Sequence, residues 1–373
     1  MKRILFIGLL LVSWALCPTA EACKKTTTAE QDTSVLKRVI HYPSVDAKGE
    51  VLTLSGVLVV PKDKQPKGLI LLPHYTITAN KEAPSNNLTH EAAFYKEDYV
   101  LVMPDYIGYA LTGDRVHPYL CGELTARNTV DMLLHCQPII DSMALGISTD
   151  SIYVVGYSQG GASALWTLKL LEEQYAGKIY VKKCFAGGSP VDVANTLDDV
   201  LSHGFVPAPA LIPLLVYGMI EGYQLDWKPE DVLTRVMRKY YKKYIRTKNY
   251  GVMELFWLMP NHTPSYWLTK PAMDRTTPEG KKLYDGLLRS SLVHFDTDGQ
   301  GTDSICPSWT PKAPLMVFHS INDNLVPFQS GANLRRCWGE LPNIEWEFEK
   351  FGGHMNSSKI FHGKVVERLK NKD

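Results

Sequence analysis

A strand, a glycine-rich turn and a helix follow one another between residues 152 and 171, and this stretch constrains the fold more than any other. The β-branched and aromatic run Ile152-Tyr-Val-Val leads into Gly156-Tyr-Ser-Gln-Gly160, and residues 163–171 have helical composition. A side chain at Gly156 or Gly160 would crowd the approaching strand and helix. The sharp turn therefore pushes Ser158 outward, where a base and a substrate can reach it.

The helix behind Ser158 points free backbone N–H groups at the same spot, and such donors suit a developing oxyanion. The pattern is also compatible with an ordinary glycine-rich turn between a strand and a helix. An acid and a histidine that follow in the right order would distinguish a nucleophile from such a turn.

Short apolar runs alternate with amphipathic segments along most of the chain, which indicates an α/β fold with a doubly wound, mostly parallel sheet. Ser158 would then lie at the carboxyl end of a central strand, where such folds bind ligands. The strand of the turn is joined by strands expected at 35–45, 51–60, 68–73, 99–104, 181–188, 314–319 and 343–351, and helices are expected near 90–97, 122–143, 159–177 and 357–369.

The alternation is interrupted at residues 191–306, which we name the cap segment. It contains the apolar but proline-broken stretch Phe205–Ile220 and an amphipathic helix predicted over Glu230–Tyr244. We expect an insertion that covers the edge of the sheet at Ser158 and walls an apolar pocket, dividing the α/β core into 35–190 and 307–373. A helical subdomain packed only against itself is the alternative. A basic cluster opposite the apolar stripe is expected to be a solvated face: Arg235, Arg238, Lys239, Lys242 and Lys243.

Asp323 and His354 each follow a predicted strand, and with Ser158 they give the order Ser, Asp, His along the chain. Serine is a weak nucleophile, so a histidine must accept its proton and return it to the leaving group. A carboxylate must then orient that imidazole and stabilise its positive charge. We therefore expect Ser158, His354 and Asp323 to be nucleophile, base and acid.

Other residues compete for these roles. His319 and His362 are expected to be structural histidines within a strand and the last helix. Asp296 and Asp298 lie in a glycine-containing loop that could hold calcium but lacks the terminal glutamate of an EF-hand. The sequence has no HExxH or CxxC spacing, so it implies no metal and no cofactor.

Four motifs together resemble the secretory lipase family of α/β hydrolases, of the lipase A type. They are Pro104-Asp-Tyr-Ile-Gly108, Gly156-Tyr-Ser-Gln-Gly160, Gly187-Gly-Ser-Pro-Val191 and the segment 318–328 around Asp323. The resemblance implies a capped α/β-hydrolase fold that acts on carboxylic esters, often of fatty acids, with Ser158, Asp323 and His354 as its triad.

The resemblance also implies an oxyanion hole formed by the residue after the nucleophile, here Gln159, and by the aspartate that matches Asp105. Gln159 departs from the small residue common in the family, although its backbone N–H would still serve. Topology points instead to Tyr75, on the loop after the third strand, as the second donor. Both Asp105 and Tyr75 therefore remain candidates.

The N-terminus has the layout of a signal peptide over residues 1–22, with a basic start and an apolar run too short to span a bilayer. Cys23 would begin the mature chain, followed by a polar tether to residue 34. The residues before Cys23 match a lipobox poorly, so both a lipid-tethered protein and a freely secreted one remain open. We expect export to the periplasm, the outer membrane or the medium.

Near-neutral charge, with 40 Lys and Arg against 39 Asp and Glu, offers no nucleic-acid footprint. Five cysteines lie beyond residue 34, an odd number that allows one or two disulfides and leaves at least one thiol. The expected function is an exported serine carboxylic-ester hydrolase acting on small esters with apolar or aromatic acyl groups. The alternatives are a serine peptidase of the prolyl type and a catalytically silent binding protein. The oligomeric state is left open.

Overall fold

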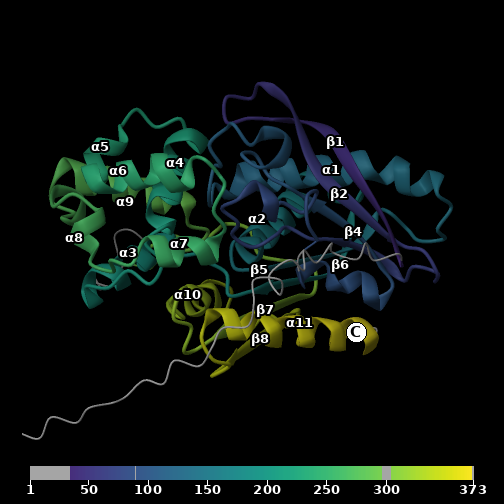
Figure 1. Cartoon of the computed structure of the whole chain (residues 1–373). Coiled ribbons are helices and arrows are strands. Elements are labelled where there is room, and N and C mark those ends of the chain that lie inside the picture. Colours follow the sequence, from purple (N-terminus) through teal and green to yellow (C-terminus); the bar gives the residue numbers. More distant parts are fainter. Residues whose placement is uncertain (1–33, 89, 296–303, 372–373) are drawn as a thin grey trace, which may run out of the picture. The chain divides into compact units, whose positions relative to one another are not determined.

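In the described part of the chain, eight strands form one sheet in the order β1-β2-β4-β3-β5-β6-β7-β8 (Figure 1). The computed structural model describes residues 34–88, 90–295 and 304–371. The predicted signal peptide, Cys23, nearly all of the tether and the loop with Asp296 and Asp298 lie outside the described residues. The strands are β1 (Val35–Val45), β2 (Val51–Pro61), β3 (Gly68–Leu71), β4 (Tyr99–Pro104), β5 (Ser151–Tyr157), β6 (Tyr180–Gly187), β7 (Leu315–Ser320) and β8 (Ile344–Glu349).

Helices occupy most of the remaining chain. Among the described residues, no helix is both long enough and apolar enough to cross a membrane. The α-helices are α1 (Gly122–Ser142), α2 (Gln159–Gln174), α3 (Val193–His203), α4 (Leu211–Gly222), α5 (Pro229–Val232), α6 (Arg235–Tyr240), α7 (Val252–Leu258), α8 (Pro264–Trp267), α9 (Pro278–Ser290), α10 (Gln329–Trp338) and α11 (His354–Asn371). The 3₁₀-helices are η1 (Asn80–Glu82), η2 (His90–Glu97), η3 (Ala110–Thr112) and η5 (Pro271–Met273), and η4 (Tyr241–Ile245) is a π-helix.

The sheet is antiparallel at its start and parallel from β4 onward. β1 pairs with β2, and β2 with β4, in antiparallel register, whereas β4, β3, β5, β6, β7 and β8 pair in parallel. The carboxyl ends of the parallel strands therefore share one edge, which carries the loops after β3, β4, β5, β7 and β8. The predicted doubly wound, mostly parallel sheet is confirmed.

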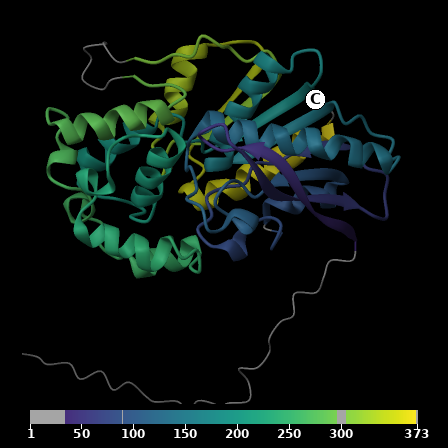
Figure 2. The same cartoon turned by 90° about the horizontal axis from the view of Figure 1, so that it is seen from above.

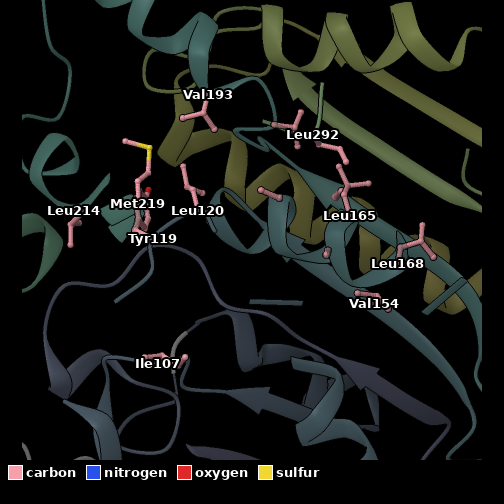
Figure 3. Packing of buried hydrophobic residues seen from close by; sticks show 14 of the residues in the cluster. Ile107, Tyr119, Leu120, Val154, Leu165, Leu168, Val193, Leu214, Met219 and Leu292 are labelled. Carbon is pink, nitrogen blue, oxygen red and sulfur yellow. The ribbon is translucent and has the colours of Figure 1, made fainter. Parts of the chain in front are cut away.

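Both faces of the sheet are buried, which explains the continuous apolar runs of its strands. Leu69 and Leu71 of β3 face the side covered by α1 and α2, and Ile70 and Leu72 face the side covered by η2 and α11. Figure 3 shows Val154 of β5 beside Leu165 and Leu168 of α2.

Helices α3 to α9 lie between β6 and β7 in the chain, within the cap segment, and gather beside one end of the sheet (Figures 1 and 2). Met219 of α4 and Val193 of α3 lie close to Tyr119 and Leu120 of the core (Figure 3). Within the cap segment, Leu292 N–H donates to the Val191 carbonyl at 2.8 Å. Helices of the cap segment thus share a hydrophobic cluster with the segment before α1.

The helix predicted over Glu230–Tyr244 is broken in the structure. It forms α5, α6 and the π-helical turn η4, and the break lies at Leu233 and Thr234. Leu233 forms a β-bridge with Leu268, and the Thr234 side chain caps α6 by accepting from Met237 N–H. The apolar periodicity of the sequence correctly indicates a buried stripe. The helix is nevertheless interrupted, because Leu233 pairs with Leu268 and Thr234 caps a new helix. Opposite the stripe, Arg235, Lys239, Lys242 and Lys243 are exposed, whereas Arg238 is half-buried.

The last helix begins earlier than predicted. α11 starts at His354 instead of Ser357, so His354 is the first residue of a helix and not part of a loop. The pair Gly352-Gly353 ends the preceding loop, and Gly352 adopts a φ of +108°, which favours glycine.

A disulfide joins Cys306 to Cys337, across 31 residues that include β7 and α10. Cys121, Cys136 and Cys184 are buried free thiols. One bridge with thiols left over agrees with the odd count of cysteines.

Breaking this disulfide should destabilise the protein. Closing a loop of this length limits the unfolded chain, so Cys306→Ser with Cys337→Ser should lower the free energy of unfolding by about 3 kcal/mol. Denaturant unfolding with and without reductant measures this. Reductant should lower the stability of the wild type and leave the double variant unchanged. Equal stability of all four samples would show that the bridge does not form.

Candidate active site

Ser158 occupies a strained backbone conformation at the end of β5. Its φ of 57° and ψ of −125° are unusual for a residue with a side chain. The turn leaves no room at its glycines: a Cβ on Gly156 would lie 2.1 Å from the Gly160 carbonyl oxygen, and one on Gly160 would lie 2.3 Å from the Pro73 carbonyl oxygen. Close packing of β5, α2 and the loop after β3 thus presents the serine, as the sequence predicts.

Three side chains distant in sequence meet at this point. His354 Nε2 lies 2.9 Å from Ser158 Oγ, and His354 Nδ1 lies 2.7 Å from Asp323 Oδ2. Ser158 and Asp323 follow β5 and β7, and His354 begins α11 after β8, so all three lie at the same edge of the sheet. Of the residues predicted as nucleophile, base and acid, the structure brings all three together.

Asp323 and His354 are both held by further hydrogen bonds. Asp323 Oδ1 accepts from the N–H groups of Leu325 and Val326, each at 2.9 Å. His354 N–H donates to Asn324 Oδ1 at 2.9 Å, and the Tyr157 hydroxyl donates to the His354 carbonyl at 2.7 Å. His354 is therefore held by hydrogen bonds to both its ring and its backbone.

Asp323 remains ionised although it is buried. Burial opposes ionisation, but the hydrogen bond and charge of His354, the charge of His319 and the N–H of Leu325 together hold the pKa of Asp323 below its ordinary value. An ionised carboxylate is the form that can orient an imidazole and stabilise an imidazolium.

The two competing histidines serve other contacts. His319 is buried, and its Nε2 lies 3.1 Å from the Val326 carbonyl and 4.0 Å from Asp323 Oδ2. His362 lies on α11, with Nδ1 2.7 Å from the Ser358 carbonyl. Both positions agree with structural roles.

The three predicted oxyanion donors differ in their surroundings. Gln159 is the first residue of α2, where N–H groups have no partner inside the helix. Asp105 N–H donates to the Ser55 carbonyl, and its carboxylate accepts from Ser55 Oγ and Ser85 N–H. This geometry argues against Asp105 as a donor, because its amide is engaged and its side chain only accepts.

Tyr75 lies on the wall of the cavity beside Ser158, as topology suggests. Its N–H, however, donates to Glu91 Oε2 at 3.1 Å. Burial raises the pKa of Glu91 well above its ordinary value, although the hydrogen bond from Tyr75 N–H opposes this. Tyr75 N–H would thus have to exchange this partner to meet a substrate.

A cavity of about 350 Å³ opens at Ser158 and His354 and extends among the helices of the cap segment. Its size falls in the range of small-molecule sites. Glu82 is the one charged residue among the described residues that line it, and its Oε2 accepts from Thr78 and Ala79 N–H. The apolar wall comes mainly from α3, α4, α7 and α9: Val193, Leu197, Val200, Leu211, Ile212, Leu215, Val216, Val252, Met253, Phe256, Leu283 and Leu287.

Sequence reasoning missed Asn324, Tyr157 and Glu82. Tyr157 and Asn324 are neighbours in sequence of the predicted nucleophile and acid, and this adjacency was the available signal. Glu82 could not be found in that way, because its link to the cavity depends on the fold of the loop after β3. Among the described residues, no group of three or more His, Cys, Asp or Glu side chains is placed to hold a metal ion.

The pKa of Asp323 gives a stability test. Folding lowers the pKa of Asp323, so the ionised side chain stabilises the fold at pH values above its ordinary pKa of 3.8. This contribution is lost as the pH falls through the pKa of the folded state. The melting temperature of the wild type should therefore exceed that of Asp323→Asn near neutral pH, and the gap should shrink as the pH falls below 3.8. Asp63→Asn, at an exposed position, is the control. A gap independent of pH would contradict the assignment.

Comparisons with known proteins agree with this architecture. No family model matches the sequence. A secreted triacylglycerol lipase of Malassezia restricta is 24% identical over 343 residues, covering 89% of this chain and 65% of the relative. One of Malassezia furfur is 23% identical over 256 residues, covering 67% and 58%. The chain therefore spans less than two thirds of the length of these relatives.

Solved structures share the fold at low identity. The rice cell wall degrading esterase LipA of Xanthomonas oryzae superimposes with a TM-score of 0.73 at 16% identity, covering 91% of this chain and 90% of that one. Candida antarctica lipase A in its closed state gives 0.65 at 16% identity, covering 86% and 73%. The resemblance expected from the four motifs is confirmed. The chain is an α/β-hydrolase by fold and is similar in sequence to secreted lipases.

Proposed function

We propose that the chain is a serine carboxylic-ester hydrolase that works through an acyl-enzyme. The observation that carries this proposal is the hydrogen-bonded series Ser158, His354 and Asp323 at the end of an apolar cavity. Similarity to proteins named as triacylglycerol lipases, and a fold shared with esterases, support the same reaction class.

In the proposed reaction, His354 Nε2 accepts the proton of Ser158 as Oγ attacks the ester carbonyl carbon. Asp323 holds Nδ1 and stabilises the imidazolium that forms. The tetrahedral intermediate collapses, the imidazolium protonates the leaving alcohol, and the acyl group stays on Ser158. Water then attacks that ester with His354 again as base, which releases the carboxylic acid and restores the serine.

The negative oxygen of each tetrahedral intermediate needs donors beside Ser158. We assign the N–H of Gln159 as the first, because it begins α2 directly after the nucleophile. Tyr75 is the better of the two candidates for the second, since its loop lines the cavity and Asp105 does not adjoin it in the described residues. In this assignment, Tyr75 N–H leaves Glu91 when the substrate binds.

The cavity wall favours an aliphatic or aromatic acyl group, because burying apolar surface there is favourable and few polar groups would compensate a charge. A prolyl-type peptidase would use an acidic pair to bind a free amino terminus. Glu82 stands alone as an acid on the described wall, and its Oε2 is already engaged with backbone N–H groups. The ester reading therefore has more support.

We further propose that the protein is exported, from the predicted signal peptide and from relatives named as secreted. A lipid on Cys23 remains an alternative to free secretion. The cap segment, residues 191–306, is proposed to cover the site and exclude water from it.

Active-site labelling tests the nucleophile. A fluorophosphonate probe should label the wild type, and Ser158→Ala should abolish labelling and lower turnover of esters by about a thousandfold or more, because it removes the hydroxyl that His354 Nε2 contacts. Ser163→Ala, in the helix α2 that follows Ser158, is the matched control and should remain labelled. A wild type that neither reacts with the probe nor hydrolyses esters would favour a silent binding protein.

Substrate preference tests the cavity. With nitrophenyl esters of increasing acyl length, kcat/KM should rise from acetyl to medium chains by about tenfold or more. Each methylene buried in the cavity can stabilise the transition state by roughly 0.8 kcal/mol, so two of them suffice for this increase. Gly-Pro amides, assayed in parallel, should be poor substrates. Efficient cleavage of the amides, or a preference for acetyl esters, would contradict the proposed specificity.

A further inference from the structure

The side chain of Gln159 is buried beside the proposed oxyanion hole, although only its backbone has a role in the reaction described above. The residue is 1% exposed, and its Nε2 lies 2.7 Å from His117 Nε2. His117 comes from the segment before α1, about forty residues earlier in the chain. The buried side chain of Gln159 therefore has a specific partner, the imidazole of His117.

The hydrogen-bonding groups around His117 fix its tautomer. His117 Nδ1 lies 2.8 Å from the Ile107 carbonyl, which can only accept, so Nδ1 carries the proton. Nε2 of the neutral ring is then an acceptor, and it takes the N–H of Gln159. If the Gln159 amide were reversed, Oε1 would face His117 Nε2, and a hydrogen bond would require a proton on that nitrogen as well. The His117 ring would then be a buried cation, which is unfavourable.

The imidazole of His117 is held in place on several sides. It stacks on Tyr106 with ring centroids 5.8 Å apart and contacts Tyr109 and Tyr119 at 5.0 and 5.9 Å. A Cβ on Gly108 would lie 2.7 Å from His117 N, so the loop after β4 packs directly against the backbone of His117. Lys248 of the cap segment donates from Nζ to the carbonyls of Gly108 and Arg115, which fixes both flanks of this contact.

Gln159 retains a buried polar atom that the contact does not satisfy. Its Oε1 has no hydrogen-bond partner among the described residues. An unsatisfied buried carbonyl disfavours folding, and such groups concentrate at functional sites. An apolar side chain would fill the space without this penalty, so stability alone does not account for glutamine here.

We propose that His117 is a positioning residue: by accepting a hydrogen bond from the Gln159 side chain, it orients the Gln159 backbone N–H toward the oxyanion formed at Ser158. This inference rests on the proposed ester hydrolysis. The side chain and the amide belong to one residue at the first turn of α2, so fixing one end restricts rotation of the other. Substrate binding in the cavity does not involve this contact.

His117 remains neutral over the working range of an esterase. Burial, with the charges of Lys248 and His74, lowers its pKa to about 3, although the hydrogen bonds with Ile107 and Gln159 oppose this. The other titratable groups around the ring are the three tyrosines that contact it, and burial raises the pKa of each. The acceptor at Nε2 is therefore present throughout.

Four variants and one control variant test the proposal. His117→Leu removes the acceptor and should lower kcat by about tenfold with KM changed less than twofold, because the loss falls on the transition state. His117→Gln can present Oε1 near the position of Nε2 and should recover most of kcat. Gln159→Leu should resemble His117→Leu, and the double variant should be no slower than either single one. His135→Leu, on α1, is the control for the same substitution elsewhere.

Melting temperatures and ¹⁵N NMR of the imidazoles complete the design. The spectrum of the wild type should show His117 protonated at Nδ1 alone. Equal kcat in folded His117→Leu and wild type would overturn the proposal, as would a change in KM without one in kcat. If His117→Leu does not fold, the comparison of kcat with KM is made on His117→Gln and Gln159→Leu instead. A folded Gln159→Leu variant with the kcat of the wild type would then overturn the proposal. An inactive, unlabelled wild type would instead refute the proposed function, so the two failures are distinguishable.

Discussion

The close approach of β5, α2 and the loop after β3 is the constraint on which the site depends. Gly156 and Gly160 allow backbone to touch backbone there, and Ser158 is left with a positive φ that only tight surroundings maintain. Residues in such conformations disfavour folding by about 1–3 kcal/mol each and persist where the surrounding structure determines them. The parallel strands provide that surrounding structure, because burial on both faces fixes their register.

The same edge of the sheet gathers groups that act together. Asp323 lies after β7 and His354 begins α11 after β8; neighbouring groups hold each of them, and His354 links Asp323 to Ser158. The cap segment contributes differently: its apolar helices wall the cavity, and Lys248 holds the loops behind the proposed oxyanion hole. The site thus combines a hydrogen-bonded polar edge with an apolar cavity wall, which suits the proposed chemistry on an ester with an apolar acyl group.

Local patterns predicted the sheet and the order Ser158, Asp323, His354, because turn chemistry and strand periodicity are properties of short segments. The broken helix around Thr234 and the start of α11 at His354 depend on tertiary contacts that no short segment encodes. The same limit applies to Asp105 and Tyr75. Each follows a strand at the correct edge, but Asp105 N–H is bonded to Ser55 and Tyr75 N–H to Glu91, and both of these partners are distant in sequence.

A crystal structure of the protein trapped with a medium-chain alkyl phosphonate tests the central claim most directly. We predict a covalent bond from phosphorus to Ser158 Oγ, the phosphoryl oxygen within hydrogen-bond distance of Gln159 N–H, and the alkyl chain inside the cavity of the cap segment. Attachment to another residue, or an alkyl chain directed into solvent with the cavity empty, would contradict the account.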